Sequence, residues 1–138
     1  MNDYAWSDLA VGMRASFSVA LDRDMLASFR SLSGDDNPLH SDPEEAARRG
    51  YPDVVAFGML TSVFYSRLVG VHLPGRRCLL HGIQVDFVAP AFAGDALTVA
   101  GEITHLTEAY RQAEIRATMQ NQRGELVSRA RIRVGVHA

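Results

Sequence analysis

The sequence FGMLTSVFYSRLVG, residues 57–70, predicts the element around which the rest of the chain must fold. Apolar side chains fall on nearly every side of the helix that it would form: Met59, Leu60, Val63, Phe64, Leu68 and Val69. A helix that is apolar all round is buried, because none of its sides is suited to water. Gly58 lies at its start and GVHLPG follows it, so we expect a buried helix over residues 57–69.

The segments before this helix predict one strand and two shorter helices. Residues 15–21, ASFSVAL, alternate apolar and polar side chains, as a half-buried strand does. The first helix begins after Asp22 or Asp24 and ends at Gly34; its apolar side consists of Met25, Leu26, Phe29 and Leu32. The second begins at Asp42 and Pro43, which suit the N-cap and the first helical position.

The remainder of the chain predicts strands, because apolar and polar residues alternate with a period of two. The alternating stretches are 83–87, 97–103, 113–119 and 126–134, and the gaps between them suit an antiparallel meander. An antiparallel sheet with one polar face must cover its other face, and the long apolar helix is available to do so. We therefore expect a single α+β domain over residues 1–138, with a curved antiparallel sheet wrapped around residues 57–69.

The composition argues against several classes of function. The chain has 138 residues and a net charge of −2, whereas a nucleic-acid-binding protein should show a basic excess. Cys78 is the single cysteine and the histidines outside residues 34–40 have no ligand spacing, so we expect no disulfide framework and no metal site. No apolar run approaches the ~20 residues that span a membrane. The N-terminus resembles no secretory signal, so a cytoplasmic location is the default expectation.

A short loop between the two predicted shorter helices gathers groups suited to catalysis. Its sequence is GDDNPLH, residues 34–40, and Asp35 and His40 stand on either side of a proline. A carboxylate and an imidazole held together can grip one water molecule and move a proton near neutral pH. Asn37 can bond backbone groups and stiffen the loop. The alternative is a solvated turn, because turns prefer the same residue types.

Gly58 offers a second kind of chemistry. A glycine at the start of a buried helix exposes backbone N–H groups at the positive end of the helix dipole. Such a site can stabilise charge that develops on a carbonyl oxygen. Close packing of the helix on the sheet is the alternative reason for a glycine at this position.

Together these segments resemble the MaoC-like, (R)-specific enoyl-CoA hydratases. The motif G-D-x-N-P-apolar-H is matched in full by residues 34–40, and the likeness extends from about residue 11 to residue 134. The other matching residues are Phe29, DP at 42–43, FGMLTS, LVG and LPG within 57–75, Val85, Asp86, Phe87, Pro90 and GD at 94–95.

The resemblance implies a hot-dog fold and a homodimer whose two sheets join edge to edge. It implies a hydro-lyase of fatty acid metabolism, which adds water to a 2-enoyl thioester or removes it from an (R)-3-hydroxyacyl thioester. Asp35 and His40 fall on the catalytic pair, Gly58 on the backbone N–H that polarises the thioester carbonyl, and Ser66 on a supporting serine. Phe57 departs from the family, in which a histidine usually precedes this glycine. We expect Phe57 either to stand beside the thioester and affect substrate preference, or only to pack against the sheet.

Further substrate contacts are open to two readings. Arg76 and Arg77 follow LPG in a loop and are candidates for the phosphates of coenzyme A, or are solvated. Tyr65 belongs to the core or lines an acyl tunnel. No redox cofactor or metal is needed, because coenzyme A or the phosphopantetheine of an acyl carrier protein is part of the substrate. Two other functions remain open: a hot-dog thioesterase, and a non-catalytic subunit that binds acyl thioesters or supports assembly.

Overall fold

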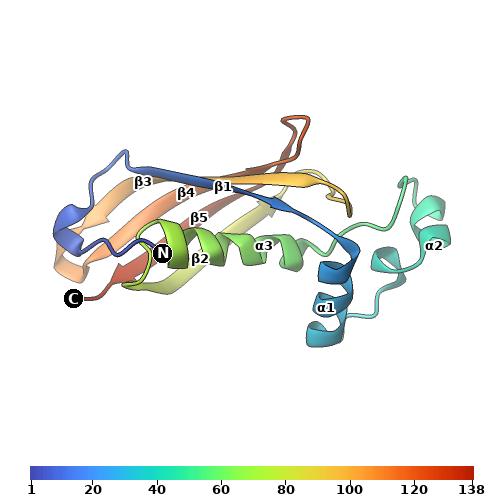
Figure 1. Cartoon of the computed structure of the whole chain (residues 1–138), viewed down its shortest axis with the longest axis horizontal. Helices are drawn as coiled ribbons and strands as arrows, with labels where there is room; N and C mark the ends of the chain where they lie inside the picture. Colours follow the sequence, from blue (N-terminus) through green and yellow to red (C-terminus); the bar gives the residue numbers. More distant parts are fainter.

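A five-stranded antiparallel sheet and one long helix beside it form the body of the protein in a computed structural model that describes residues 1–138 (Figure 1). The strands are β1 (Arg14–Ala20), β2 (Cys78–Phe87), β3 (Ala96–Thr107), β4 (Gln112–Gln120) and β5 (Leu126–Val136). The helices are α1 (Arg23–Ser33), α2 (Pro43–Arg48) and α3 (Gly58–Arg67), and α3 continues as a π-helical segment over Leu68–His72. The α+β architecture expected from the sequence is confirmed.

The two shorter helices begin and end where their capping residues stand. The Asp22 carboxylate accepts a hydrogen bond from the Met25 N–H at 2.8 Å, and the Asp42 carboxylate accepts one from the Glu44 N–H at 2.9 Å. Gly34 ends α1 in the left-handed conformation, with φ of 73°, which glycine adopts without steric cost. Both helices lie beyond one end of the sheet, near the start of α3 (Figure 1).

The strand order is β1-β3-β4-β5-β2, so the predicted meander is correct only for β3, β4 and β5. β2 and β3 follow one another in the sequence but lie in separate places, because residues 88–95 carry the chain across the end of the sheet. The alternation of side chains indicates which face a residue occupies and says nothing about which strands are neighbours. As a result, β2 is an edge strand that pairs only with β5.

The core lies between α3 and the inner face of the sheet. Fully buried side chains of β3, β4 and β5 meet Tyr65 of α3 and Leu68 of the π-helical segment; they include Leu97, Val99, Ile103, Ile115, Met119 and Ile132. The Tyr65 hydroxyl and the Ser128 hydroxyl are 2.7 Å apart and satisfy one another within this apolar layer. Burial raises the pKa of Tyr65 above its ordinary value.

One side of α3 is exposed, and the expectation of a helix buried all round is wrong for the single chain. Met59 and Val63 are 66% and 50% exposed, and Ile83 and Phe87 on neighbouring β2 are 43% and 52% exposed. A single sheet can cover only one side of a helix, and the other side of α3 continues into the free edge of β2. None of the helices has both the length and the apolar composition needed to cross a membrane.

The buried hydroxyl pair allows a test of the core. Tyr65→Phe and Ser128→Ala should each lower the free energy of unfolding by about 1–2 kcal/mol, because each leaves one buried hydroxyl without a partner. The double variant should lose clearly less than the sum of the two. Tyr110→Phe is the control, because Tyr110 is 77% exposed and should change stability little. Additive losses in chemical denaturation would contradict the hydrogen bond.

Candidate functional site

His40 is held by a hydrogen bond that determines which of its ring nitrogens is free. It ends the 3-10 turn Pro38–His40, and its Nδ1 lies 2.7 Å from the carbonyl oxygen of Val55. A carbonyl oxygen only accepts hydrogen bonds, so Nδ1 must carry the proton and donate it. In the neutral ring Nε2 then has a free lone pair, and no protein group is bonded to it. The arrangement suits a general base whose free nitrogen can take a proton.

The loop that carries His40 is stiffened by its own side chains. The Asn37 amide oxygen accepts a hydrogen bond from the Leu39 N–H at 3.1 Å, as the sequence analysis expected of Asn37. An Asp35 carboxylate oxygen accepts one from the Asn37 N–H at 3.1 Å. The Ser33 hydroxyl accepts one from the Asp35 N–H and donates one to the Phe29 carbonyl. The loop is therefore anchored to the last turn of α1.

Asp35 is exposed, and no hydrogen bond joins it to His40. Its carboxylate is turned toward the backbone of its own loop through one oxygen, which leaves the second oxygen without a protein partner. The sequence analysis expects the two side chains to hold one water molecule between them. In this arrangement they are connected only if such a water is bound. The joint action of Asp35 and His40 stays a prediction.

Phe57 lies inside the protein and not at the surface of a cavity opening, because only 2% of it is exposed. Its ring stacks on the His40 imidazole with a centroid distance of 4.1 Å and an interplanar angle of 30°. On another side it meets Phe29 of α1 at 4.9 Å. Its relation to the substrate is therefore indirect, through the wall that it builds behind His40.

The backbone N–H of Gly58 is available for a ligand. Gly58 is the first residue of α3, where the helix offers no acceptor for it, and no other group of the chain accepts its hydrogen bond. A Cβ atom at this position would come within 3.1 Å of the Phe87 ring, so a glycine allows that ring to approach the start of the helix. Both roles expected of Gly58, close packing and an exposed donor, are compatible with this geometry.

His40 and Gly58 line one cavity of about 290 Å³. The other residues of its wall are mainly apolar, and they are Tyr51, Val55, Ala56, Thr61, Phe87, Val88, Ala89, Pro90, Ala91 and Val127. An apolar wall lowers the local dielectric and strengthens the interaction of a donor with developing charge. The cavity therefore combines a proton acceptor and a carbonyl-polarising N–H within apolar surroundings.

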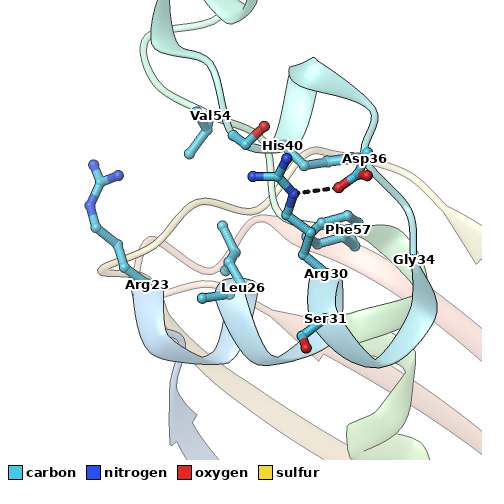
Figure 2. A pocket seen from close by; sticks show the side chains of 11 residues that line it. Arg23, Leu26, Arg30, Ser31, Gly34, Asp36, His40, Val54 and Phe57 are labelled. Carbon is cyan, nitrogen blue, oxygen red and sulfur yellow. Dashed lines mark hydrogen bonds and ion pairs between the residues drawn. The ribbon is translucent and has the colours of Figure 1, made fainter.

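A second cavity of about 510 Å³ also contains His40, between α1 and the loop (Figure 2). Arg23 and Arg30 extend from α1 along this space, and Arg30 donates to Asp36 at 2.7 Å. Phe57 forms part of the wall between α1 and His40. His40 thus contributes to the walls of both cavities.

Four other predicted residues lie away from this place in the single chain. Ser66 is exposed on α3, about 12 Å along the helix axis from Gly58 at 1.5 Å per residue. Tyr65 belongs to the core and lines neither cavity. Arg76 and Arg77 line a separate cavity of about 490 Å³ beyond the far end of α3, where Arg77 donates to Asp3 at 2.7 Å.

The sequence analysis missed the residue that holds His40. Val55 acts through its backbone: its carbonyl accepts from His40, and its N–H donates to the Leu39 carbonyl at 3.1 Å. A backbone contact leaves no mark on the side chain, so no sequence signal could have identified it. Phe29 and Phe87 were recognised as parts of the family pattern, but their places beside Phe57 and Gly58 appear only in three dimensions.

The cap of the His40 loop can be tested by two substitutions. Asn37→Ala should lower the free energy of unfolding by about 1 kcal/mol, because the Leu39 N–H loses its acceptor. Asn37→Asp keeps an oxygen at the same place and should stay within about 0.5 kcal/mol of the unsubstituted protein. Chemical denaturation compares them, and equal stability of the two variants would contradict a capping role.

The comparisons with known proteins agree with the fold and identify the family. The MaoC like domain family matches residues 9–124. The chain is 38% identical over 100 residues to the (R)-specific enoyl-CoA hydratase of Aeromonas caviae, covering 72% of this chain and 75% of that protein. It is 28% identical over 113 residues to the 3-hydroxybutyryl-CoA dehydratase of Methylorubrum extorquens, covering 82% of this chain and 72% of that protein.

Solved structures give the same result. An (R)-hydratase from A. caviae involved in PHA biosynthesis superposes with a TM-score of 0.89 at 33% identity, covering 94% of this chain and 98% of that one. An R-hydratase from Pseudomonas aeruginosa superposes with a TM-score of 0.91 at 26% identity, covering 97% of this chain and 86% of that one. The hot-dog fold expected from the sequence is confirmed, and the chain belongs to the MaoC-like dehydratase family.

Proposed function

We propose that this protein is a hydro-lyase that adds water to a 2-enoyl thioester to give an (R)-3-hydroxyacyl thioester, or catalyses the reverse. The observation that carries the proposal is a cavity with mainly apolar walls that is lined both by His40, whose Nε2 has no protein partner, and by Gly58, whose N–H is unpaired. Relatives named as (R)-specific enoyl-CoA hydratase and 3-hydroxybutyryl-CoA dehydratase support the same reaction class.

In the proposed reaction each group of the site has one task. Asp35 and His40 hold the water, and its oxygen adds to the β-carbon while one of its protons passes to the pair. The double-bond electrons move toward the carbonyl, and the Gly58 N–H stabilises the enolate-like oxygen. A proton then returns to the α-carbon, which completes the addition of water. The reaction is assigned to the pair, and neither residue is named as the formal base.

The substrate is proposed to be a thioester of coenzyme A or of an acyl carrier protein, with no metal or redox cofactor. The apolar wall around Gly58 suits the acyl part. Two arginines remain for the phosphates, but Arg76 and Arg77 lie beyond the opposite end of α3, about 20 Å away by the helical rise. A single chain therefore does not combine the thioester site with these cations.

A second copy of the chain would bring them together, and we propose a homodimer. β2 has an unpaired edge, and exposed apolar residues of β2 and α3 adjoin it: Met59, Val63, Leu80, Ile83 and Phe87. Free strand edges of this kind are sites of pairing. If two β2 strands pair antiparallel about their middle, Cys78 of the partner subunit stands opposite Phe87, beside Gly58. Arg77 of the partner subunit then lies near the cavity, as does the partner's side of α3 that carries Ser66.

A thioesterase and a non-catalytic acyl-thioester-binding subunit could use the same site, and one experiment distinguishes both from a hydro-lyase. With an enoyl-CoA as substrate, loss of enoyl absorbance and release of free thiol are followed in the same reaction. The proposal predicts loss of enoyl absorbance without thiol release. Thiol release instead would indicate a thioesterase, and binding of acyl-CoA without either change, across acyl chain lengths, would indicate a non-catalytic subunit.

Substitution of the proposed pair tests the mechanism. Asp35→Asn and His40→Ala should each lower the turnover number by at least ~10²-fold with the fold intact, given the usual effect of positioned acid–base groups. Asp42→Asn is the matched control in the same segment, because asparagine also caps helices well and should preserve α2. Near-full turnover of either site variant at saturating enoyl-CoA would contradict the mechanism.

The dimer can be tested on the two faces of one strand. Ile83→Glu places a charge on the exposed apolar face of β2 and should convert the dimer into monomers at micromolar concentration. Gln84→Glu places the same charge on the opposite face of β2 and should leave the dimer intact. Light scattering reports the mass. A monomeric unsubstituted protein, or a dimeric Ile83→Glu variant, would refute the interface.

A further inference from the structure

We propose that Phe57 is a positioning residue: its ring fixes the plane of the His40 imidazole and so directs Nε2 for proton transfer. The inference rests on the proposed function, because it concerns the orientation of one member of the proposed catalytic pair. It replaces the expectation that Phe57 contacts the acyl group directly, since 2% exposure leaves almost none of the ring for a substrate.

A single hydrogen bond does not fix an imidazole. The bond from Nδ1 to the Val55 carbonyl and the attachment through Cβ hold two points of the ring, but the ring can still tilt about the line that joins them. The Phe57 ring limits this freedom on one face, because it stacks on the imidazole with its centroid 4.1 Å away and an interplanar angle of 30°. The hydrogen bond and the stack together determine where Nε2 points.

Phe57 can act as a fixed support because it is itself immobilised. The Phe29 ring packs against it at 4.9 Å with an interplanar angle of 51°. Phe57 is also the N-cap residue of α3, so the next residue along the backbone is Gly58. One dipeptide therefore positions both groups of the proposed site, the imidazole through the Phe57 ring and the carbonyl-polarising N–H through the Gly58 backbone.

The chemistry of the ring matters as much as its shape. A phenyl ring has neither a hydrogen-bond donor nor an acceptor, so it cannot compete with water or substrate for Nε2. A histidine at this position would bring two further ring nitrogens. With Phe57, the Val55 carbonyl is the one protein group that is hydrogen-bonded to the imidazole. The proton-transfer nitrogen of His40 is thereby reserved for the reaction.

The test compares two Phe57 variants with a matched control elsewhere in the chain. Phe57→Leu removes the flat ring and keeps an apolar side chain, whereas Phe57→His restores a planar ring. The control is Phe17→Leu, because Phe17 makes the same kind of stack with His72, at 4.9 Å and an interplanar angle of 13°. Each variant is examined for kcat and KM on an enoyl-CoA, for thermal unfolding, and for the NMR shifts of the His40 ring protons.

We expect Phe57→Leu to lower kcat about tenfold or more with KM nearly unchanged, because misplacement of a catalytic group by a fraction of an ångström slows proton transfer. The upfield ring-current shift of the His40 protons should be lost at the same time. Phe57→His should recover kcat only in part, because it restores a planar ring but adds nitrogens that can compete for Nε2. Phe17→Leu should reduce stability without changing kcat.

An unchanged kcat in Phe57→Leu, or an equal loss of kcat in Phe17→Leu, would overturn the inference and leave Phe57 as packing alone. If Phe57→Leu does not fold, Phe57→Met takes its place with the same expectations. The NMR shift of His40 in the unsubstituted protein is independent of turnover. A missing upfield shift would refute the stack even if the protein hydrates enoyl-CoA, whereas a stacked His40 in an inactive protein would refute the proposed function alone.

Discussion

Two hydrogen bonds between Val55 and the end of the loop that carries His40 organise the candidate site. Val55 donates its N–H to Leu39 and accepts a hydrogen bond from His40 at 2.7 Å, so one residue holds two successive positions of the loop. The next residue, Ala56, donates to the Ala91 carbonyl at 2.8 Å. The approach to α3 is therefore fixed between the His40 loop on one side and the crossing from β2 to β3 on the other. The tautomer of His40 and the place of Gly58 both follow from it.

This arrangement explains why a site can be built at the end of the sheet and not within its core. The core beneath α3 is filled by large side chains such as Tyr65, Leu68 and Met119, and the Tyr65 and Ser128 hydroxyls within it satisfy one another. At the start of α3 the helix instead supplies unpaired N–H groups, and the crossing segment supplies apolar walls. The rigid core positions the helix, and the loops around its first turn carry the chemistry.

The sequence predicted the parts of the fold that depend on local pattern. Asp22, Gly34 and Asp42 mark helix ends through interactions that span only a few residues, and the strands follow from alternation. The position of β2 at the edge could not be predicted, because alternation is the same for a strand on either side of β5. The exposed side of α3 was missed for a related reason. The apolar pattern predicts that every side of the helix is covered, but the single chain covers only one side.

For the site, the family motif identified His40 and Gly58, and the structure brings both to one cavity. The motif could not show that Phe57 is buried behind His40. An apolar residue type at a helix start is compatible both with contact to a substrate and with burial in the interior. Nor could the motif show that Ser66, Arg76 and Arg77 are distant from Gly58 within one chain, since their separation depends on the length of α3 and on where β2 lies.

The proposed chemistry requires a His40 that is protonated on Nδ1 and free on Nε2. Nitrogen-15 NMR of the histidine ring, recorded at a pH where the imidazole is neutral, distinguishes the two tautomers through the shifts of their protonated and bare nitrogens. We expect one stable tautomer for His40, with the proton on Nδ1 and a bare Nε2 whose signal changes when an enoyl thioester analogue binds. A proton on Nε2, or rapid averaging of the two forms as in a free histidine, would contradict the hydrogen bond from His40 to Val55 and the mechanism built on it.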